Sequence, residues 1–241
     1  MRRLIPLIMC LFSVTQASAA NQCSAVFPDG ASTHSSGNNY DGSSRDAVQC
    51  NPSLDSASQF TVLSASAEVT CTNSIIEGDM GALGKITKTG CVHDGAVVEE
   101  VSQGIQDDFS AAYSALANVQ CPIGNNLTKL VGEVLPPGTY CFDAALTNIN
   151  DVLTLEGNAS DTWLFKIGTS GTGALVGTDF VVEMSGGAKA CNVTWWVAEA
   201  VTLTRSTFKG NILAGKAVTV TGASSSIKGR VMAHETISLT N

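Results

Sequence analysis

The sequence predicts an all-β solenoid, in which short strands stack coil upon coil, with one long α-helix packed alongside. The first observation is a Thr/Ser-x-Thr triplet that recurs at distant places in the chain. The second is a repeat with an offset of 19 residues, because residues 211–222 align without a gap on residues 230–241. The third is that only residues 95–119 carry a strong helical pattern of apolar residues.

Four triplets share the same alternation of a hydroxyl, an apolar and a second hydroxyl side chain. Because successive strand residues point to opposite sides of a sheet, the central residue faces inward and the two hydroxyls face outward. Stacked coils then present a ladder of hydroxyl pairs, and we expect function on this surface rather than in a cleft. The candidate residues are Thr70, Thr72, Thr202, Thr204, Thr219, Thr221, Ser238 and Thr240.

The chain is expected to have three parts. Residues 1–20 combine a charged start, a short apolar run and small residues before the expected cut, which is the pattern of a secretory signal. Residues 21–58 are rich in Ser, Gly, Asn and Asp and are expected to be irregular. Residues 59–241 are expected to form the solenoid. We therefore expect a secreted, extracellular protein.

Composition limits the partners. Of the 241 residues only 14% are charged, and the formal net charge is −8. No basic stripe is present that could neutralise phosphates, so we expect no nucleic-acid partner. We also expect no membrane partner, no cofactor and a monomer.

Eight cysteines occur, and Cys10 lies in the expected signal. An oxidising compartment favours pairing of the rest, and the odd number leaves one over. The expected pairs are local ones: Cys23–Cys50, Cys71–Cys91 and Cys121–Cys141, with Cys191 left buried. No metal site is expected, because no C-x-x-C motif is present and His34, His93 and His234 are scattered.

The first coil is expected between Phe60 and Gly78, where residues 68–78 match residues 217–229 with a small gap. The coil pattern is then interrupted for about a hundred residues before it returns near Asn192. Short β-rich runs fill much of that interval, bounded by turn residues. The expected strands are residues 152–156, 163–167, 180–184 and 193–197, and the expected corner glycines are Gly78, Gly210 and Gly229.

The helix over 95–119 is predicted from one apolar stripe at spacings of three and four. Asp94 or Gly95 is its expected start, and Pro122 follows its end. A single amphipathic helix in an all-β chain must bury its stripe against a sheet. The stripe consists of Val98, Val101, Ile105, Phe109, Ala112 and Leu116.

Three N-x-S/T sequons occur, at Asn126, Asn158 and Asn192, and these matter in a eukaryotic secretory route. Asn192 opens an expected strand and is therefore a poor acceptor. Trp195 and Trp196 are neighbours on that strand, so one is expected in the core and the other on the opposite side, under the helix.

Five segments in order, residues 138–142, 163–168, 187–197, 208–214 and 228–233, resemble the secreted ice-binding (antifreeze) proteins of polar algae, fungi and bacteria. The resemblance runs from about Phe60 to Asn241. It implies a discontinuous right-handed β-helix with a helix alongside, in which the N-terminal coil joins the stack of C-terminal coils. It also implies a flat face that adsorbs to ice and inhibits ice growth and recrystallisation.

The family's short motif T-[AG]-x-[TN] points to further candidates. Residues 221–224 fit it with Ser224 in the last place, whereas residues 204–207 depart because Arg205 replaces a small residue. Thr207 and Ser226 are added as candidate ice-binding residues. Lys209 and Lys228 stand beside them, and bulky charges would spoil a flat ice-binding surface, so either the active face excludes these columns or the protein binds ice weakly.

Two other function classes compete with ice binding. An enzyme of the β-helix lyase or hydrolase type needs carboxylates that converge in a groove, and the acidic residues here are dispersed, so we expect no catalysis. An extracellular polysaccharide-binding or adhesin module on the same scaffold is the alternative that we keep. Glu77, Lys209 and Lys228 each precede a corner glycine, which fits either a charge ladder or a solvated edge.

Overall fold

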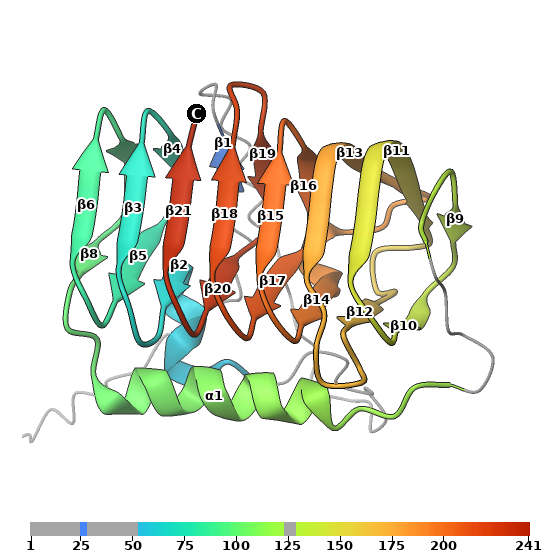
Figure 1. Ribbon diagram of the computed structural model, residues 1–241, viewed down its shortest axis with the longest axis horizontal. Helices are drawn as coiled ribbons and strands as arrows, with labels where there is room; N and C mark the ends of the chain where they lie inside the picture. Colours follow the sequence, from blue (N-terminus) through green and yellow to red (C-terminus); the bar gives the residue numbers. More distant parts are fainter. Residues whose placement is uncertain (1–24, 28–52, 123–128) are drawn as a thin grey trace, which may run out of the picture.

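The computed structural model describes residues 25–27, 53–122 and 129–241, and these residues form a β-helix with one α-helix beside it (Figure 1). The predicted fold class is confirmed. A 13-stranded and an eight-stranded sheet make up its walls, and stacked strands pair in parallel. The expected signal over 1–20, the expected Cys23–Cys50 bond and the Asn126 sequon lie outside the described residues.

The 13-stranded sheet turns a corner and so supplies two of the three faces. We call the first the Thr face; it comprises β6 (Ile86–Thr89), β3 (Val69–Thr72), β21 (Ile237–Thr240), β18 (Val218–Thr221), β15 (Val201–Thr204) and the first halves of β13 (Leu175–Ser185) and β11 (Leu146–Glu156). We call the second the back face; it comprises the second halves of β11 and β13, with β9 (Val134–Leu135), β16 (Thr207–Lys209), β19 (Ser226–Lys228), β1 (Ala25–Phe27), β4 (Ile75–Ile76) and β7 (Val92–His93).

The eight-stranded sheet forms the third side, which we call the helix face. Its strands, in spatial order, are β10 (Gly138–Phe142), β12 (Trp163–Ile167), β14 (Val193–Val197), β17 (Asn211–Ala214), β20 (Val231–Ala233), β2 (Phe60–Ser64), β5 (Asp79–Ala82) and β8 (Val97–Val98). The helical elements are α1 (Gln103–Ala117) and the short turns η1 (Asp55–Gln59) and η2 (Ala190–Asn192). In the described part of the chain, no helix is long and apolar enough to cross a bilayer.

The chain fills the stack in two separate runs. It enters in the middle at β2 and winds to one end at β8. Helix α1 then runs along the side of the stack, and the second run begins with β9 and β10 at the opposite end (Figure 1). The second run winds back until β20 pairs with β2 and β21 pairs with β3. The predicted junction between the first and last coils is therefore confirmed.

The coil pattern is not interrupted as the sequence suggested. The strands from β5 to β8 and from β9 to β13 are also rungs of the stack, although they lack the triplet repeat. On the back face, β1 lies between β19 and β4 and pairs antiparallel with both. A short segment from near the N-terminus thus fills the rung between the last and first coils.

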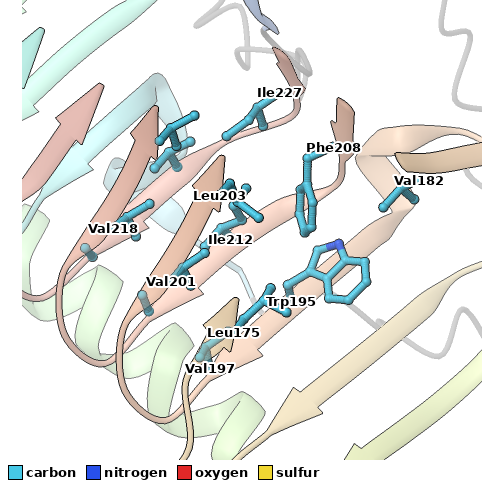
Figure 2. Close-up of a cluster of buried hydrophobic side chains, with 14 of the residues drawn as sticks. Leu175, Val182, Trp195, Val197, Val201, Leu203, Phe208, Ile212, Val218 and Ile227 are labelled. Carbon is cyan, nitrogen blue, oxygen red and sulfur yellow. The ribbon is translucent and has the colours of Figure 1, made fainter. Parts of the chain in front are cut away.

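The interior is a continuous apolar column. Leu175, Val201 and Val218 of the Thr face point inward toward side chains of the other two faces (Figure 2). Aromatic rings add a second layer of stacking along the axis: Phe165 and Trp195 lie in paired strands with ring centroids 4.0 Å apart. Because coils repeat in register, the inward side chains of successive rungs stack on one another and fill the space between the walls.

Helix α1 begins later than the pattern predicted, at Gln103 rather than near Asp94 or Gly95. Val97 and Val98 pair with β5 as an additional rung, and Glu100 has a left-handed φ of 55° that a helix cannot continue through. Val98 satisfied the helical spacing only by coincidence, because it belongs to a strand. The helix also ends two residues before the predicted limit, at Ala117.

The stripe of α1 packs on the helix face, as predicted. Phe109, Ala112 and Leu116 are buried against a layer that includes Leu213 and Trp196. The indole of Trp196 donates to the Tyr113 carbonyl at 3.1 Å, while Trp195 lies in the core, so the expected division of this pair is confirmed.

Lys166 fixes the end of α1. It is buried on the helix face, and its Nζ donates to the carbonyls of Ala117 at 2.9 Å and Val119 at 2.5 Å. These are carbonyls that the helix leaves without partners, and a positive charge is favourable at this end of the helix dipole. Burial lowers the pKa of this ammonium group.

Two of the predicted disulfides are present. Cys71–Cys91 joins β3 to the segment after β6, and Cys121–Cys141 joins the segment after α1 to β10. Cys191, which we expected to be buried, is half-buried within η2. The interval between α1 and the second run of coils is therefore covalently closed.

Candidate functional site: a ladder of small side chains on the Thr face

Strand register builds the Thr face. Thr202, Thr219, Ser238 and Thr70 stand in one column because β15, β18, β21 and β3 pair without a register shift. Two residues further along each strand, a second column forms from Thr204, Thr221, Thr240 and Thr72. The eight triplet residues therefore gather on one surface, as predicted.

Both columns are longer than the sequence prediction. Neighbouring strands extend the first column with Thr87, Val176 and Thr147, and the second with Thr89, Thr178 and Ile149. Seven rungs about 4.8 Å apart span about 29 Å. The Thr-x-Thr pattern of Thr87 to Thr89 could have been found in the sequence; we missed it because Lys88 stands in the inward place.

A third column borders the first. Backbone hydrogen bonds continue the ladder one residue before each strand, through the carbonyls of Ala174, Ala200, Ala217 and Thr236. In the five rungs from β11 to β21 the outward side chain at this position is an alanine or a threonine. Each of these rungs thus presents three outward side chains, of which Ile149 is the bulkiest, and none of the fifteen positions carries a charge or an aromatic ring.

Charged residues occur only at one end of this third column. Glu68 and Lys85 occupy the position in the last two rungs, β3 and β6. The uncharged area therefore covers β11, β13, β15, β18 and β21. These strands lie side by side at the front of the molecule (Figure 1).

The corner between the Thr face and the back face consists of stacked left-handed residues. Asn150, Asp179 and Arg205 have φ values of 52°, 51° and 48°, and Gly222 has a φ of 101°. This conformation turns the chain within one residue. Because each coil turns at the same register position, the second column ends in a straight edge.

Arg205 does not lie over the Thr face. Its Nε donates to Asp179 Oδ1 at 2.9 Å and its second guanidinium nitrogen donates to Asp179 Oδ2 at 2.6 Å, so the side chain runs along the corner. These hydrogen bonds lower the pKa of Asp179. At the opposite border, Lys216 and Glu199 form the second ion pair at 2.8 Å. Charged pairs thus flank the face on both sides.

The outward hydroxyls are half-buried or exposed at the surface. Thr204 Oγ1 and Thr221 Oγ1 lie 3.2 Å apart, within hydrogen-bond distance across two rungs. Threonine χ1 is stiff, so each hydroxyl and its methyl group are held in fixed places. The arrangement can order a sheet of water; it contains no group that could act as a nucleophile with a base.

Three predicted residues lie away from this surface. Thr207 and Ser226 pair with each other on the back face, beyond the corner, and Ser224 is exposed within the corner itself. Residues 204–207 therefore span a corner, with their two ends on different faces, whereas residues 221–224 end within the corner. Because the corner is one residue long at Arg205, the alternation of inward and outward positions restarts there.

The charged residues beside them belong to the back face as well. Lys209 pairs with Lys228 in adjacent rungs. Strand β1 lies between β19, which carries Lys228, and β4, which directly precedes Glu77. Burial lowers the pKa of Lys209, with Glu183 opposing that effect. These three residues do not form one ladder of alternating charge. In the described ranges, no cluster of three or more His, Cys, Asp or Glu residues could hold a metal ion.

Comparisons with known proteins agree with this geometry. An ice-binding protein of Flavobacterium frigoris (strain PS1) is 29% identical over 190 residues, covering 70% of this chain and 67% of that protein. An ice-binding protein of Typhula ishikariensis is 39% identical over 92 residues, which is 37% of this chain and 36% of its own length.

Solved structures share the fold. The crystal structure of the ice-binding protein from the Antarctic ascomycete Antarctomyces psychrotrophicus has a TM-score of 0.69 at 27% identity, and the match covers 79% of this chain and 95% of that one. The ice-binding protein from an Antarctic biological consortium has a TM-score of 0.70 at 22% identity, with 81% and 91% covered. The sequence profile described as Ice-binding-like matches residues 55–241, and the resemblance noted in the sequence is confirmed. Because this match covers most of the chain, the protein belongs to the Ice-binding-like family.

Proposed function

We propose that this protein binds ice through the Thr face and so inhibits the growth and recrystallisation of ice. The observation that carries the proposal is the continuous area on β11, β13, β15, β18 and β21, where each rung presents three outward side chains that are uncharged and non-aromatic. The names of the related proteins from Flavobacterium frigoris and Typhula ishikariensis support the same function.

The mechanism is adsorption, and no bond is broken. Hydroxyls hydrogen-bond to surface water, and the methyl groups beside them disfavour a disordered hydration layer. The repeat of about 4.8 Å between rungs holds these groups in a regular array. Regular stacking also keeps the sheet from accumulating twist, so the array can match many waters at once.

The Thr face can order adsorbed water only if the side chains that bind the water are held rigidly. The inward residues of the Thr face, such as Val201, Val218 and Ile237, are fully buried, so each rung is anchored from behind. Water that bridges fixed groups loses little in hydrogen-bond enthalpy relative to a direct contact. A rigid array therefore orders water with a small entropic cost to the protein.

The surface fits ice better than a polysaccharide. Sugar rings stack on exposed aromatic side chains, and none of the three columns contains one. We further propose that the protein acts outside the cell, which the two disulfides support, since such bonds persist in oxidising compartments. We propose that it acts as a monomer, without nucleic acid or membrane.

The test is the shape and freezing point of single ice crystals in a nanolitre osmometer. The wild-type protein is expected to facet the crystals and to separate melting from freezing. Ala217→Tyr, in the third column, should reduce this gap, whereas Ser224→Tyr, exposed in the corner, should leave it unchanged. Unfaceted crystals with the wild-type protein would refute the function, and binding in a glycan array would then favour the polysaccharide alternative.

A further inference from the structure

The sequons at Asn158 and Asn192 meet at one corner of the β-helix, and their side chains have opposite environments. Asn158 lies in the turn between β11 and β12 and is exposed, as are Ala159 and Ser160. Asn192 lies at the end of η2, directly before β14, and is half-buried. An N-linked glycan needs an amide nitrogen that is accessible and has no other partner.

The Asn158 turn has the geometry of a glycan acceptor. Its Oδ1 accepts from Ser160 Oγ at 2.7 Å and from the Ser160 backbone N–H at 3.0 Å. Its Nδ2 makes no hydrogen bond to the described part of the chain. The hydroxyl of the sequon thus engages the amide oxygen and leaves the amide nitrogen available.

This turn is formed by local contacts. The Asn158 backbone N–H donates to Asp161 Oδ2 at 2.8 Å, and the Asp161 backbone N–H donates to the Asn158 carbonyl at 3.2 Å. Bonds between residues two or three apart can form in a short segment before the rest of the chain folds. The acceptor conformation is therefore accessible both to a nascent chain and to the folded protein.

Asn192 is used differently. Its Nδ2 donates to the Ala159 carbonyl at 2.9 Å, so the second sequon holds the middle residue of the first. The hydroxyl residue of that sequon, Thr194, is 1% exposed on β14. A glycan on Asn192 would remove this hydrogen bond and would have to leave a half-buried site.

We propose that Asn158 is the acceptor of an N-linked glycan and that Asn192, whose amide is held by the Ala159 carbonyl, is not an acceptor. In the transfer, Nδ2 forms a bond to the anomeric carbon of an oligosaccharide carried on a polyprenyl diphosphate. One amide proton leaves to a base of the transferase, and the polyprenyl diphosphate departs with the electrons of the broken C–O bond.

The position of the turn is compatible with the proposed function. Residues 157–162 connect the back face to the helix face, so this corner lies opposite the Thr face. A glycan there extends away from the three columns. It adds a hydrophilic volume to the side of the molecule away from the proposed ice-binding face.

The experiment secretes the full chain from yeast with Asn126→Gln in every variant, so that an N-glycan can lie only at Asn158 or Asn192. Intact mass is measured before and after peptide-N-glycosidase treatment, and the aspartate that this enzyme leaves is mapped by peptide mass spectrometry. We expect one glycan, mapped to Asn158. The Ser160→Ala variant, which retains Asn158, should lose it, and the Asn192→Gln variant should keep it.

Two results would overturn the proposal. A protein without glycan in the Asn126→Gln background would show that Asn158 is not an acceptor. A glycan mapped to Asn192, with or without Asn158, would show that the Asn192 amide is not reserved for the Ala159 carbonyl. Ser160→Thr is the conservative control and should retain the glycan, since its hydroxyl reaches the same amide oxygen.

Discussion

Behind the Thr face, the side chain of Leu203 on one rung packs into the space that Gly177 leaves on the neighbouring rung. Gly177 of β13 pairs with Leu203 of β15, and a Cβ at Gly177 would lie 2.9 Å from Leu203 Cδ2 and 3.3 Å from Phe180 Cβ. Gly177 has no left-handed φ, so the backbone itself tolerates a side chain. Packing against Leu203 and Phe180 is therefore what excludes a side chain at this position.

The perturbation is a double-mutant cycle of Gly177→Ala and Leu203→Ala. Leu203 is fully buried, and its truncation should cost about 2–5 kcal/mol of unfolding free energy. Gly177→Ala forces Leu203 to shift and should cost about 1–3 kcal/mol. In the double variant the new methyl group fills part of the cavity, so the combined loss should be smaller than the sum by about 1–3 kcal/mol.

The assay is urea unfolding followed by tryptophan fluorescence, with m compared between variants to show that the unfolded states are alike. Leu239→Ala is the matched control, because Leu239 occupies the same inward position in β21, three rungs or about 14 Å from Gly177. Gly177→Ala and Leu239→Ala should be additive. Additive losses in the Leu203 cycle as well would refute the contact.

Two further outcomes concern stability. Replacing both Cys121 and Cys141 by Ser should lower the unfolding free energy by about 3 kcal/mol, because the bond closes a loop of 20 residues; an unchanged melting temperature would contradict this. Burial lowers the pKa of His234, with Glu235 opposing that effect, and the imidazole packs on Phe109 of α1 at 4.8 Å. The unfolded chain therefore binds the proton more readily, so stability should fall as the pH drops below about 6.5. His234→Gln should flatten that part of a pH series of melting temperatures, and an unchanged slope would exclude His234 as the cause.

The triplet residues of the Thr face could be predicted because two simple rules act together there. Alternation along a strand places both hydroxyls outward, and an uninterrupted parallel register places equivalent residues in columns. Thr219 and Thr221 were found in this way. The corner glycines Gly78, Gly210 and Gly229 were also found, and their φ values of 103°, 121° and 150° agree with that role.

The two-rung end at β11 and β13 could not be predicted in the same way. These strands run through the corner at Asn150 and Asp179 without a glycine, so each reads in the sequence as one long β-rich run. Their outward residues on the Thr face include Val176 and Ile149, which do not continue the hydroxyl pattern. Their place in the two columns follows only from the strand pairing in the structure.

Thr207 and Ser226 were expected to point outward, and they do so on the back face, next to the Thr face. The sequence left open which face they belong to, because the corner at Arg205 is a single left-handed residue that no periodicity marks. The antiparallel insertion of β1 between β19 and β4 could not be predicted from the sequence either, since it depends on pairing between distant segments.

Thermal hysteresis of the Thr219→Tyr and Thr207→Tyr variants, measured side by side, distinguishes adsorption through the Thr face from adsorption through the back face. Both residues are outward, half-buried threonines on central strands, but Thr219 lies in the middle of the Thr face and Thr207 lies on the back face. If ice binds the Thr face, Thr219→Tyr loses hysteresis while its melting temperature is unchanged, and Thr207→Tyr keeps the wild-type hysteresis. Retained hysteresis in Thr219→Tyr together with loss in Thr207→Tyr would contradict adsorption through the Thr face and would assign adsorption to the back face.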